Sequence, residues 1–479
     1  MRSLKTPPRP LSGFEIVVII HTGVFLVGTT WAFGGNTAAV RPPLALWGSL
    51  GALITLSVVL GKTSVRPVDR RALRWLWPLG LFNLVALISL LNPGMKAMAQ
   101  DSETVLVPLP LSPWIPSSAM PAAARSALWL FDCSYLACFN LFLTVRNRRV
   151  LRGLLLFAVG NTLVLAIFGT VQRLSHATGL YFGQVKSPQA YFFASFIYHN
   201  HWGSFIVLMS AACLGLTWHY GRRDTGRGFF YTLGFAGLVS LLFLAITVPL
   251  STSRSCSLLL LVLLGGSFGL WTVRMVRQRR RAGEAFSGPL LGAIAAVLLG
   301  ILAIWNIDRE VIVARFSKTS EQVSQMQAAG SVGSRLELYR DTASMALAKP
   351  WFGWGAGSYP YVFYFYNTQE PNRLDGLPRF YHDAHNDWLQ TAAEYGLIGS
   401  ALLALCAIVP WIATGRGSRV GSIPRHLLAG CGLILLYAWV EFPFGNAAVV
   451  LTWWLLYFVG LRYGQISHHE DRPGSANAT

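Results

Sequence analysis

The chain has 479 residues, of which 53% are hydrophobic and 12% are charged, and its formal net charge at pH 7 is +19. Soluble globular proteins carry about 25% charged residues, so this composition excludes an ordinary soluble domain. A charge of +19 could indicate a nucleic-acid-binding protein, but the arginines are divided among short segments between apolar runs. We therefore expect membrane lipids, and no nucleic acid, around this protein.

Long apolar runs recur from the start of the chain to near its end. A helix of about 20 residues crosses a hydrocarbon core of about 30 Å, and about twelve runs are long enough. They cover approximately residues 14–33, 43–60, 73–91, 124–145, 152–172, 201–218, 229–250, 255–273, 288–306, 387–413, 424–442 and 446–462. The pattern predicts an all-α polytopic membrane protein with about 12 transmembrane helices.

The basic residues predict the orientation, because every second connection between runs is rich in arginine. By the positive-inside rule, these connections and both termini are cytoplasmic. Residues 1–306 would then hold spans one to nine, 307–386 an external loop subdomain, 387–462 spans ten to twelve, and 463–479 a cytoplasmic tail. All six cysteines fall inside predicted spans, so no disulfide framework is expected.

Three longer segments are predicted to be external. Residues 92–123, rich in Pro and Ser, are expected to form a loop, and the aromatic-rich residues 173–200 to lie on the membrane surface or dip into it. Residues 307–386 form a helical cap, with a helix at about 333–349 that Pro350 ends.

The stretch HDAHNDWLQTAAEYGLIGS places His385 where a polar loop enters an apolar helix. Histidine is the most common acid–base residue, because its reference pKa is nearest neutrality. Gly396 and Gly399 are spaced as in helices that pack closely in lipid. The alternative is a histidine without chemistry beside a packing motif.

Arginines supply candidate anion-binding groups. Arg254 lies in a short external connection near the bilayer surface, where a guanidinium usually has a partner or a ligand or extends to lipid phosphates. Arg335 and Arg340 lie five apart on the predicted cap helix, so they point to different faces. A guanidinium suits a diphosphate because it bonds in a bidentate manner and keeps its charge.

His199-Asn200-His201 opens the sixth span on the same face, and Glu394 lies inside the tenth. With His382 and Asp383, the histidines raise the alternative of a metal site. Because their spacing matches no standard metal signature, we expect no metal and no other cofactor. An ionisable residue in a span, such as Glu394, is a functional candidate.

These motifs resemble those of the O-antigen ligase family, a superfamily of bacterial membrane glycosyltransferases that includes O-antigen and exopolysaccharide polymerases. The similarity extends from about residue 150 to 450 and includes the NHWG run near Asn200, Ser253-Arg254, the run from Arg335 to Tyr359, and the AHND…EYGLIG run.

The resemblance implies transfer of a saccharide from undecaprenyl diphosphate to an acceptor, without a metal, on the periplasmic face of the inner membrane. His385 would be the catalytic base, and Arg254 with Arg335 or Arg340 would hold the diphosphate. Asn200, His201 and Glu394 join them as candidate substrate-binding residues.

The chemistry of such a transfer agrees with the residue types: a base accepts the proton of the acceptor hydroxyl, and fixed cations stabilise the departing diphosphate. We predict ligation of an O-antigen-like glycan to lipid A–core. The alternatives are polymerisation of repeat units onto a growing glycan and, in another class, a polysaccharide transporter or flippase, which would have inverted repeats and charges along a mid-membrane path.

Overall fold

The computed structural model is a bundle of long apolar helices, which confirms the all-α polytopic membrane fold. It describes residues 10–61, 69–100, 103–110, 112, 114–189, 191–221, 231–283, 333–369, 379–415 and 421–470. Within these ranges, 10 helices are long and apolar enough to cross a membrane, and Ser422–Tyr437 is a shorter apolar helix. These helices match eleven of the predicted runs, and the run at 288–306 lies outside the described residues.

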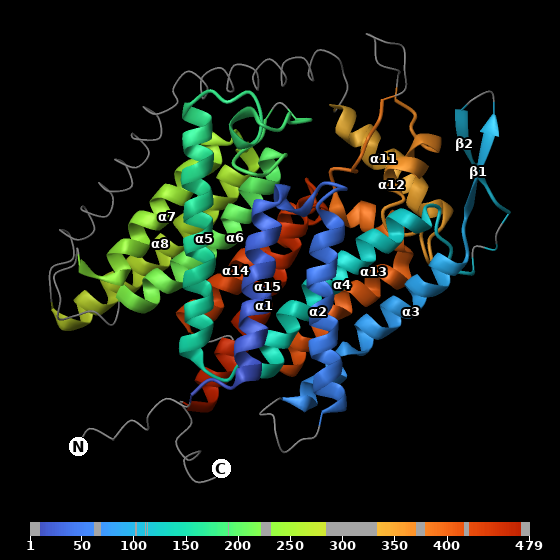
Figure 1. The fold of residues 1–479 in the computed structure, drawn as a ribbon. Helices are drawn as coiled ribbons and strands as arrows, with labels where there is room; N and C mark the ends of the chain where they lie inside the picture. Colours follow the sequence, from blue (N-terminus) through green and yellow to red (C-terminus); the bar gives the residue numbers. More distant parts are fainter. Residues whose placement is uncertain are drawn as a thin grey trace.

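The helices follow one another up and down the bundle (Figure 1). The bundle consists of the helices α1 Gly13–Trp31, α2 Arg41–Leu60, α3 Trp77–Leu91, α4 Pro121–Thr144, α5 Arg148–Leu174, α6 His199–Gly221, α7 Leu233–Leu250, α8 Arg254–Ala282, α13 Asp387–Ala413, α14 Ser422–Tyr437 and α15 Ala447–Glu470. Short 3-10 turns join some of them: η1 Phe33–Gly35, η2 Arg70–Leu76, η3 Tyr181–Gly183 and η7 Pro443–Gly445.

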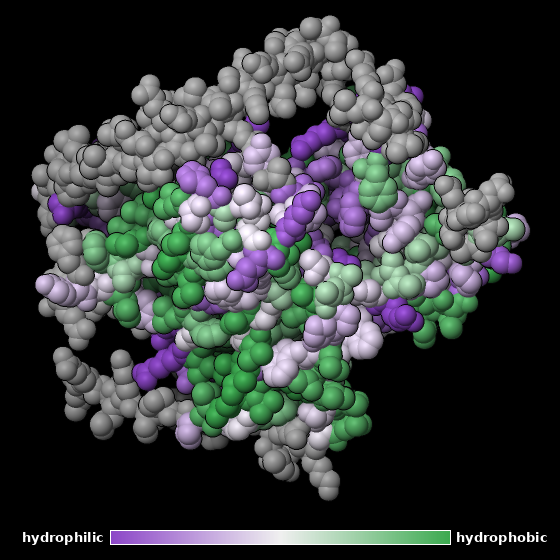
Figure 2. Space-filling model, turned by 45° about the horizontal axis from the view of Figure 1, so that its top comes forward, coloured by the Kyte–Doolittle hydropathy of each residue, from purple (hydrophilic) through white to green (hydrophobic). Residues whose placement is uncertain are grey.

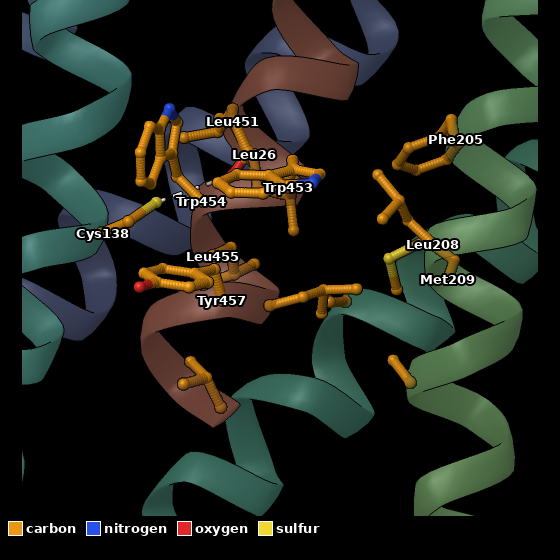
Figure 3. Close-up of a cluster of buried hydrophobic side chains, with 14 of the residues drawn as sticks. Leu26, Cys138, Phe205, Leu208, Met209, Leu451, Trp453, Trp454, Leu455 and Tyr457 are labelled. Carbon is orange, nitrogen blue, oxygen red and sulfur yellow. Dashed lines mark hydrogen bonds between the residues drawn. The ribbon is translucent and has the colours of Figure 1, made fainter. Parts of the chain in front are cut away.

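Helices α4, α6 and α15 form the centre of the bundle and are mostly buried within the protein, whereas fewer than a third of the residues in the spans of α2, α3, α8 and α13 are buried. Figure 3 shows α15 between α4 and α6, with Trp454 and Tyr457 on the side of Cys138 and Trp453 toward the α6 residues. A helix buried on all sides keeps its position, so α15 is a rigid axis for the residues at its ends.

The two ends of the bundle differ in charge. Helix α1 begins and α15 ends at the same end, opposite the end that carries α11 and the β-hairpin (Figure 1). At that first end, Arg462 donates to the carbonyl of Val145 at 2.8 Å and pairs with Asp69 at 3.6 Å. Figure 2, which turns the opposite end forward, shows hydrophilic residues gathered over it and hydrophobic residues over the flanks.

The cap consists of α11 Gly333–Ala348, the short helix α12 Tyr359–Val362 and the 3-10 turn η5 Phe363–Phe365. Helix α11 confirms the helix predicted at 333–349. Beside the cap, strands β1 Met95–Gln100 and β2 Glu103–Pro108 pair antiparallel, with Met95 opposite Pro108. The prediction of a simple loop over 92–123 was therefore wrong in this part.

Helix α13 is broken at Gly396, whose φ of 62° and ψ of −170° are not helical. The loop after α11 enters this break: the N–H of Leu397 donates to the carbonyl of Pro350 at 2.7 Å, and the N–H of Gly355 donates to the carbonyl of Glu394 at 2.8 Å. A Cβ atom on Gly396 would lie 2.4 Å from the carbonyl carbon of Trp351. The interpretation of Gly396 as a helix-packing residue was therefore wrong, because it admits a loop backbone.

Candidate active site

His385 lies at the junction of the cap and the bundle, two residues before the first residue of α13. Its φ of 51° places it in the left-handed region, which is uncommon for residues other than glycine and costs about 1–3 kcal/mol. Two contacts hold this conformation: the hydroxyl of Tyr339 donates to the His385 carbonyl at 2.8 Å, and Asn386 caps α13 by accepting from the N–H of Leu389. The imidazole side chain is 29% exposed, so a ligand can reach it.

Glu441 is the partner of this imidazole. Its Oε2 atom lies 3.1 Å from Nδ1 of His385, and its side chain is only 4% exposed. The backbone around Glu441 is fixed by Asp387, whose N–H donates to the carbonyls of Ala438 and Glu441 and whose carboxylate accepts from the N–H of Phe444 at 2.8 Å. The start of α13 thus positions both the histidine and its acid.

Burial raises the pKa of the Glu441 carboxyl, but the hydrogen bonds and charges of His385 and Arg335 outweigh burial, so the pKa is lowered overall. Glu441 is therefore ionised near neutral pH. An ionised carboxylate on Nδ1 orients the imidazole and favours the tautomer with its proton on Nδ1. Among the contacts of the described residues, Nε2 of His385 has no hydrogen-bond partner, so this atom is open to a substrate proton.

Arg335 of α11 donates from Nη2 to Oε1 of Glu441 at 2.8 Å, so the two oxygens of one carboxylate serve the arginine and the histidine. Its Nη1 atom also donates to the carbonyl of Val440 at 3.5 Å, and its side chain is 56% exposed, so further guanidinium N–H groups stay accessible. Arg340 is also exposed but lies on another face of α11, and no hydrogen bond or ion pair of the described residues joins its guanidinium to this group. The structure therefore brings Arg335, and not Arg340, to His385.

The ring of Phe442 connects the histidine to the start of α6. It meets the rings of His385 and His201 edge-on, with centroids 4.8 and 5.1 Å away, and stacks on Tyr198 at 5.2 Å. Nε2 of His201 lies 3.2 Å from the Phe442 carbonyl. Asn200 donates to the Tyr198 hydroxyl at 2.9 Å. Asn200 and His201, the two candidates from the NHWG run, thus contact the residues around Phe442.

Arg254 is the first residue of α8 and is exposed. The hydroxyl of Ser253 donates to Oδ1 of Asn200 at 2.6 Å instead of capping α8. A Cβ atom on Gly203 would lie 2.5 Å from Cβ of Cys256, so this glycine lets α6 and α8 approach closely. A guanidinium at a helix N-terminus favours anions. The neighbouring Ser253 bonds to Asn200, and Asn200 bonds to Tyr198, whose ring stacks on the Phe442 ring that meets His385.

Glu394, the last of the candidates, has its hydrogen-bond partners in the turn after α11 and not among the residues around His385. Its buried carboxylate accepts from the N–H of Gly357 at 2.9 Å and of Tyr359 at 3.1 Å, so it fixes the turn after α11. It also lines a cleft between α3, α4 and α13 with Phe82 and Tyr395. No hydrogen bond within the described part of the chain joins Glu394 to the other candidates.

Sequence reasoning missed Glu441, Phe442, Tyr198 and Tyr339. For Glu441 a signal was present, because residues 424–442 were interpreted as a span and an ionisable residue in a span is a functional candidate. The others make aromatic and hydroxyl contacts that only the folded chain shows. The described residues contain no group of three or more His, Cys, Asp or Glu side chains arranged to hold a metal ion.

The fold and this group of residues define a polytopic α-helical membrane protein with a polar site beneath a small cap. Residues 238–404 match the family model described as O-antigen ligase, which confirms the resemblance found in the motifs. Over this region the chain is similar to O-antigen ligases, and the match indicates a glycosyltransferase of the ligase or polymerase type. No curated protein matches the chain.

Proposed function

We propose that this protein transfers a saccharide from undecaprenyl diphosphate to a hydroxyl of lipid A–core, at the periplasmic face of the bacterial inner membrane. The observation that carries the proposal is the shared carboxylate of Glu441, which holds an acid–base residue and an arginine at one accessible point. A transfer to an alcohol needs a proton acceptor and a cation for the leaving group within the same few ångströms.

In this reaction, Nε2 of His385 accepts the proton of the acceptor hydroxyl while that oxygen attacks the anomeric carbon. The positive charge that forms on the imidazole is balanced by Glu441, which is buried and ionised. A single displacement of this kind inverts the anomeric centre.

Arg254 and Arg335 hold the departing diphosphate. Arg335 donates one N–H to Glu441 and one to the Val440 carbonyl. A guanidinium has five N–H donors, so the same side chain can bind a phosphate as well. Arg254 adds a second guanidinium at the N-terminus of α8. The reaction needs no metal in this proposal, because the two arginines supply the positive charge.

The charge of the bundle ends supports the orientation. Arg70 and Arg146 of the connections, and Arg462 in α15, lie toward the end where α1 begins and α15 ends, whereas His385 and Glu441 lie at the other end. With the basic end in the cytoplasm, both termini are cytoplasmic and the cap is periplasmic. Lipid-linked donors can then enter from the outer leaflet.

A deletion strain tests the function. In a gel of surface glycans, accumulation of unattached long chains on the carrier lipid identifies a ligase. Single repeat units attached to core identify a polymerase, which uses the same donor and a different acceptor. Repeat units retained on the cytoplasmic side identify a transporter and would overturn the proposal.

A further inference from the structure

The short helical segment after Ser358 in the cap has two unlike faces. Its inner face is buried in a small core of the cap. Its outer face is entirely aromatic and exposed, and the exposed fractions are 42% for Tyr361, 58% for Tyr364 and 50% for Phe365. We call these three side chains the aromatic face. Phe is mostly buried and Tyr partly buried in proteins, so three such rings together on one exposed face indicate a surface for a ligand.

A further exposed aromatic residue, Phe380, stands between this segment and His385 in the sequence. The amide of Asn367 donates to the carbonyl of Arg379 at 3.0 Å, which holds the backbone just before Phe380 beside the end of the helical segment. Phe380 is 71% exposed. Phe380 and His385 are five positions apart, a reach of at most about 18 Å, so a ligand that contacts Phe380 can extend to the imidazole.

The aromatic face is rigidly attached. Tyr359, on its inner side, shares a hydrogen bond of 2.9 Å with Thr342 of α11, and its N–H donates to Glu394 of α13. The ring of Phe363 meets Tyr381 edge-on at 5.8 Å. The face therefore keeps a fixed distance from α11 and α13, which also position Arg335 and His385.

We propose that the aromatic face and Phe380 bind the saccharide chain that is transferred, several sugar units away from the reacting bond. The inference rests on the proposed function and adds where the glycan lies. Flat aromatic rings attract the C–H groups of sugar rings through their negative π faces, at a low cost in side-chain entropy. Tyrosine hydroxyls can also bond to sugar hydroxyls. Continuity with the His385 loop favours a glycan over the bilayer surface, where aromatic residues also gather.

The test measures binding without transfer. The probe is the bacterium's own surface polysaccharide, released from lipid by mild acid and separated into fragments of one and of many repeat units. Affinity for the full-length protein in nanodiscs is measured by titration calorimetry. We expect the wild type to bind long fragments at least tenfold more tightly than single units. The combined variant Tyr361→Ala, Tyr364→Ala, Phe365→Ala should lose this difference, and Phe380→Ala should reduce it about threefold.

A matched control is Leu347→Ala, which removes an apolar side chain, 76% exposed, from α11 of the same cap. It should bind as the wild type does. If the combined variant does not fold, Tyr364→Leu keeps an apolar side chain without a ring and should still weaken binding of long fragments. Equal binding of long fragments by wild type and aromatic variants overturns the inference, as does a wild type that binds no fragment.

Further measurements distinguish a glycan surface from a bilayer surface, and a failure of this inference from a failure of the proposed function. A nitroxide on Tyr364→Cys that collides with lipid-soluble oxygen rather than with a water-soluble nickel complex would place the face in the bilayer and overturn the inference. If the wild type transfers no saccharide from undecaprenyl diphosphate but binds long fragments through the aromatic face, the proposed function fails and the glycan surface stands. If transfer occurs and binding ignores the aromatic face, only the further inference fails.

Discussion

Nδ1 of His385 lies 3.1 Å from Oε2 of Glu441, although the two residues are 56 positions apart and belong to different segments. The contact makes the imidazole part of a dyad. The carboxylate is buried and also holds Arg335, so its charge is fixed at one place. A base that becomes positive during the reaction gains from such a fixed negative neighbour.

Glu441→Gln is expected to reduce transfer about a hundredfold, because the amide cannot balance the imidazolium. Transfer from the lipid-linked donor, measured in nanodiscs, checks this effect.

The stability of the folded protein should also depend on pH through Glu441. The folded-state pKa of Glu441 is lowered from 4.5, so its contribution to stability is present above about pH 4.5 and is lost as pH falls through the lowered value. Wild type should therefore lose more stability than Glu441→Gln on acidification. Glu337→Gln, which changes an exposed acid on α11, is the control, and an equal effect there would argue against a specific role for Glu441.

His385→Gln and His385→Ala should both lose transfer by about 10²–10⁴-fold, because neither side chain can accept a full proton. Binding of the lipid-linked donor should stay near the wild-type level, since the arginines remain. Transfer by the wild type should persist in EDTA. Restoration of lost activity by a divalent ion would make His385 a metal ligand, and activity in His385→Gln would remove it as the base.

Arg335→Lys should lower transfer about tenfold to a hundredfold, because an ammonium cannot bond to Glu441 and a phosphate in the geometry of a guanidinium. Arg254→Lys should have a similar effect, and Arg254→Ala a larger one. Arg340→Lys is the matched control on the same helix as Arg335 and should behave as the wild type. Wild-type transfer in Arg254→Lys would reduce that residue to a general electrostatic role.

Much of the architecture could be predicted because it depends on local patterns. Apolar runs of sufficient length gave the spans, and the period of α11 was visible between Gly333 and Pro350. His385 and the arginines could be named from residue chemistry and motif. Their relation could not, because Glu441 reaches His385 through the end of α14 and the contacts of Asp387, which depend on the packing of the bundle.

The break in α13 at Gly396 could not be predicted from the sequence either, because it depends on a distant segment. Gly396 and Gly399 have the spacing of a helix-packing motif, and no local pattern distinguishes that use from a break. What decides it is the run from Pro350 to Gly355, 40 to 50 residues earlier, whose backbone bonds to α13 at the break. Gly353 and Gly396 thus allow the same backbone contact from its two sides. A Cβ atom on Gly353 would lie 2.4 Å from the Glu394 carbonyl.

Gly396→Ala should therefore destabilise the protein by about 3 kcal/mol or more, because a Cβ atom meets the Trp351 backbone and the φ of 62° disfavours alanine. Gly265→Ala is the control, since a Cβ atom there, in the middle of α8, has no atom within 4 Å. Thermal unfolding in detergent, followed by size-exclusion chromatography with fluorescence detection, compares the two. Equal midpoints would show that the break is not needed for stability.

The orientation can be tested with single cysteines, because all six native cysteines are buried. Ser344→Cys lies on the exposed face of α11, and Ala282→Cys is exposed at the last residue of α8. With the cap in the periplasm, an impermeant maleimide added to intact spheroplasts should label Ser344→Cys and should reach Ala282→Cys only after lysis. The reverse order would invert the protein. A periplasmic transfer site at His385 would then be impossible, because α11 carries Arg335 to the same carboxylate that holds the histidine.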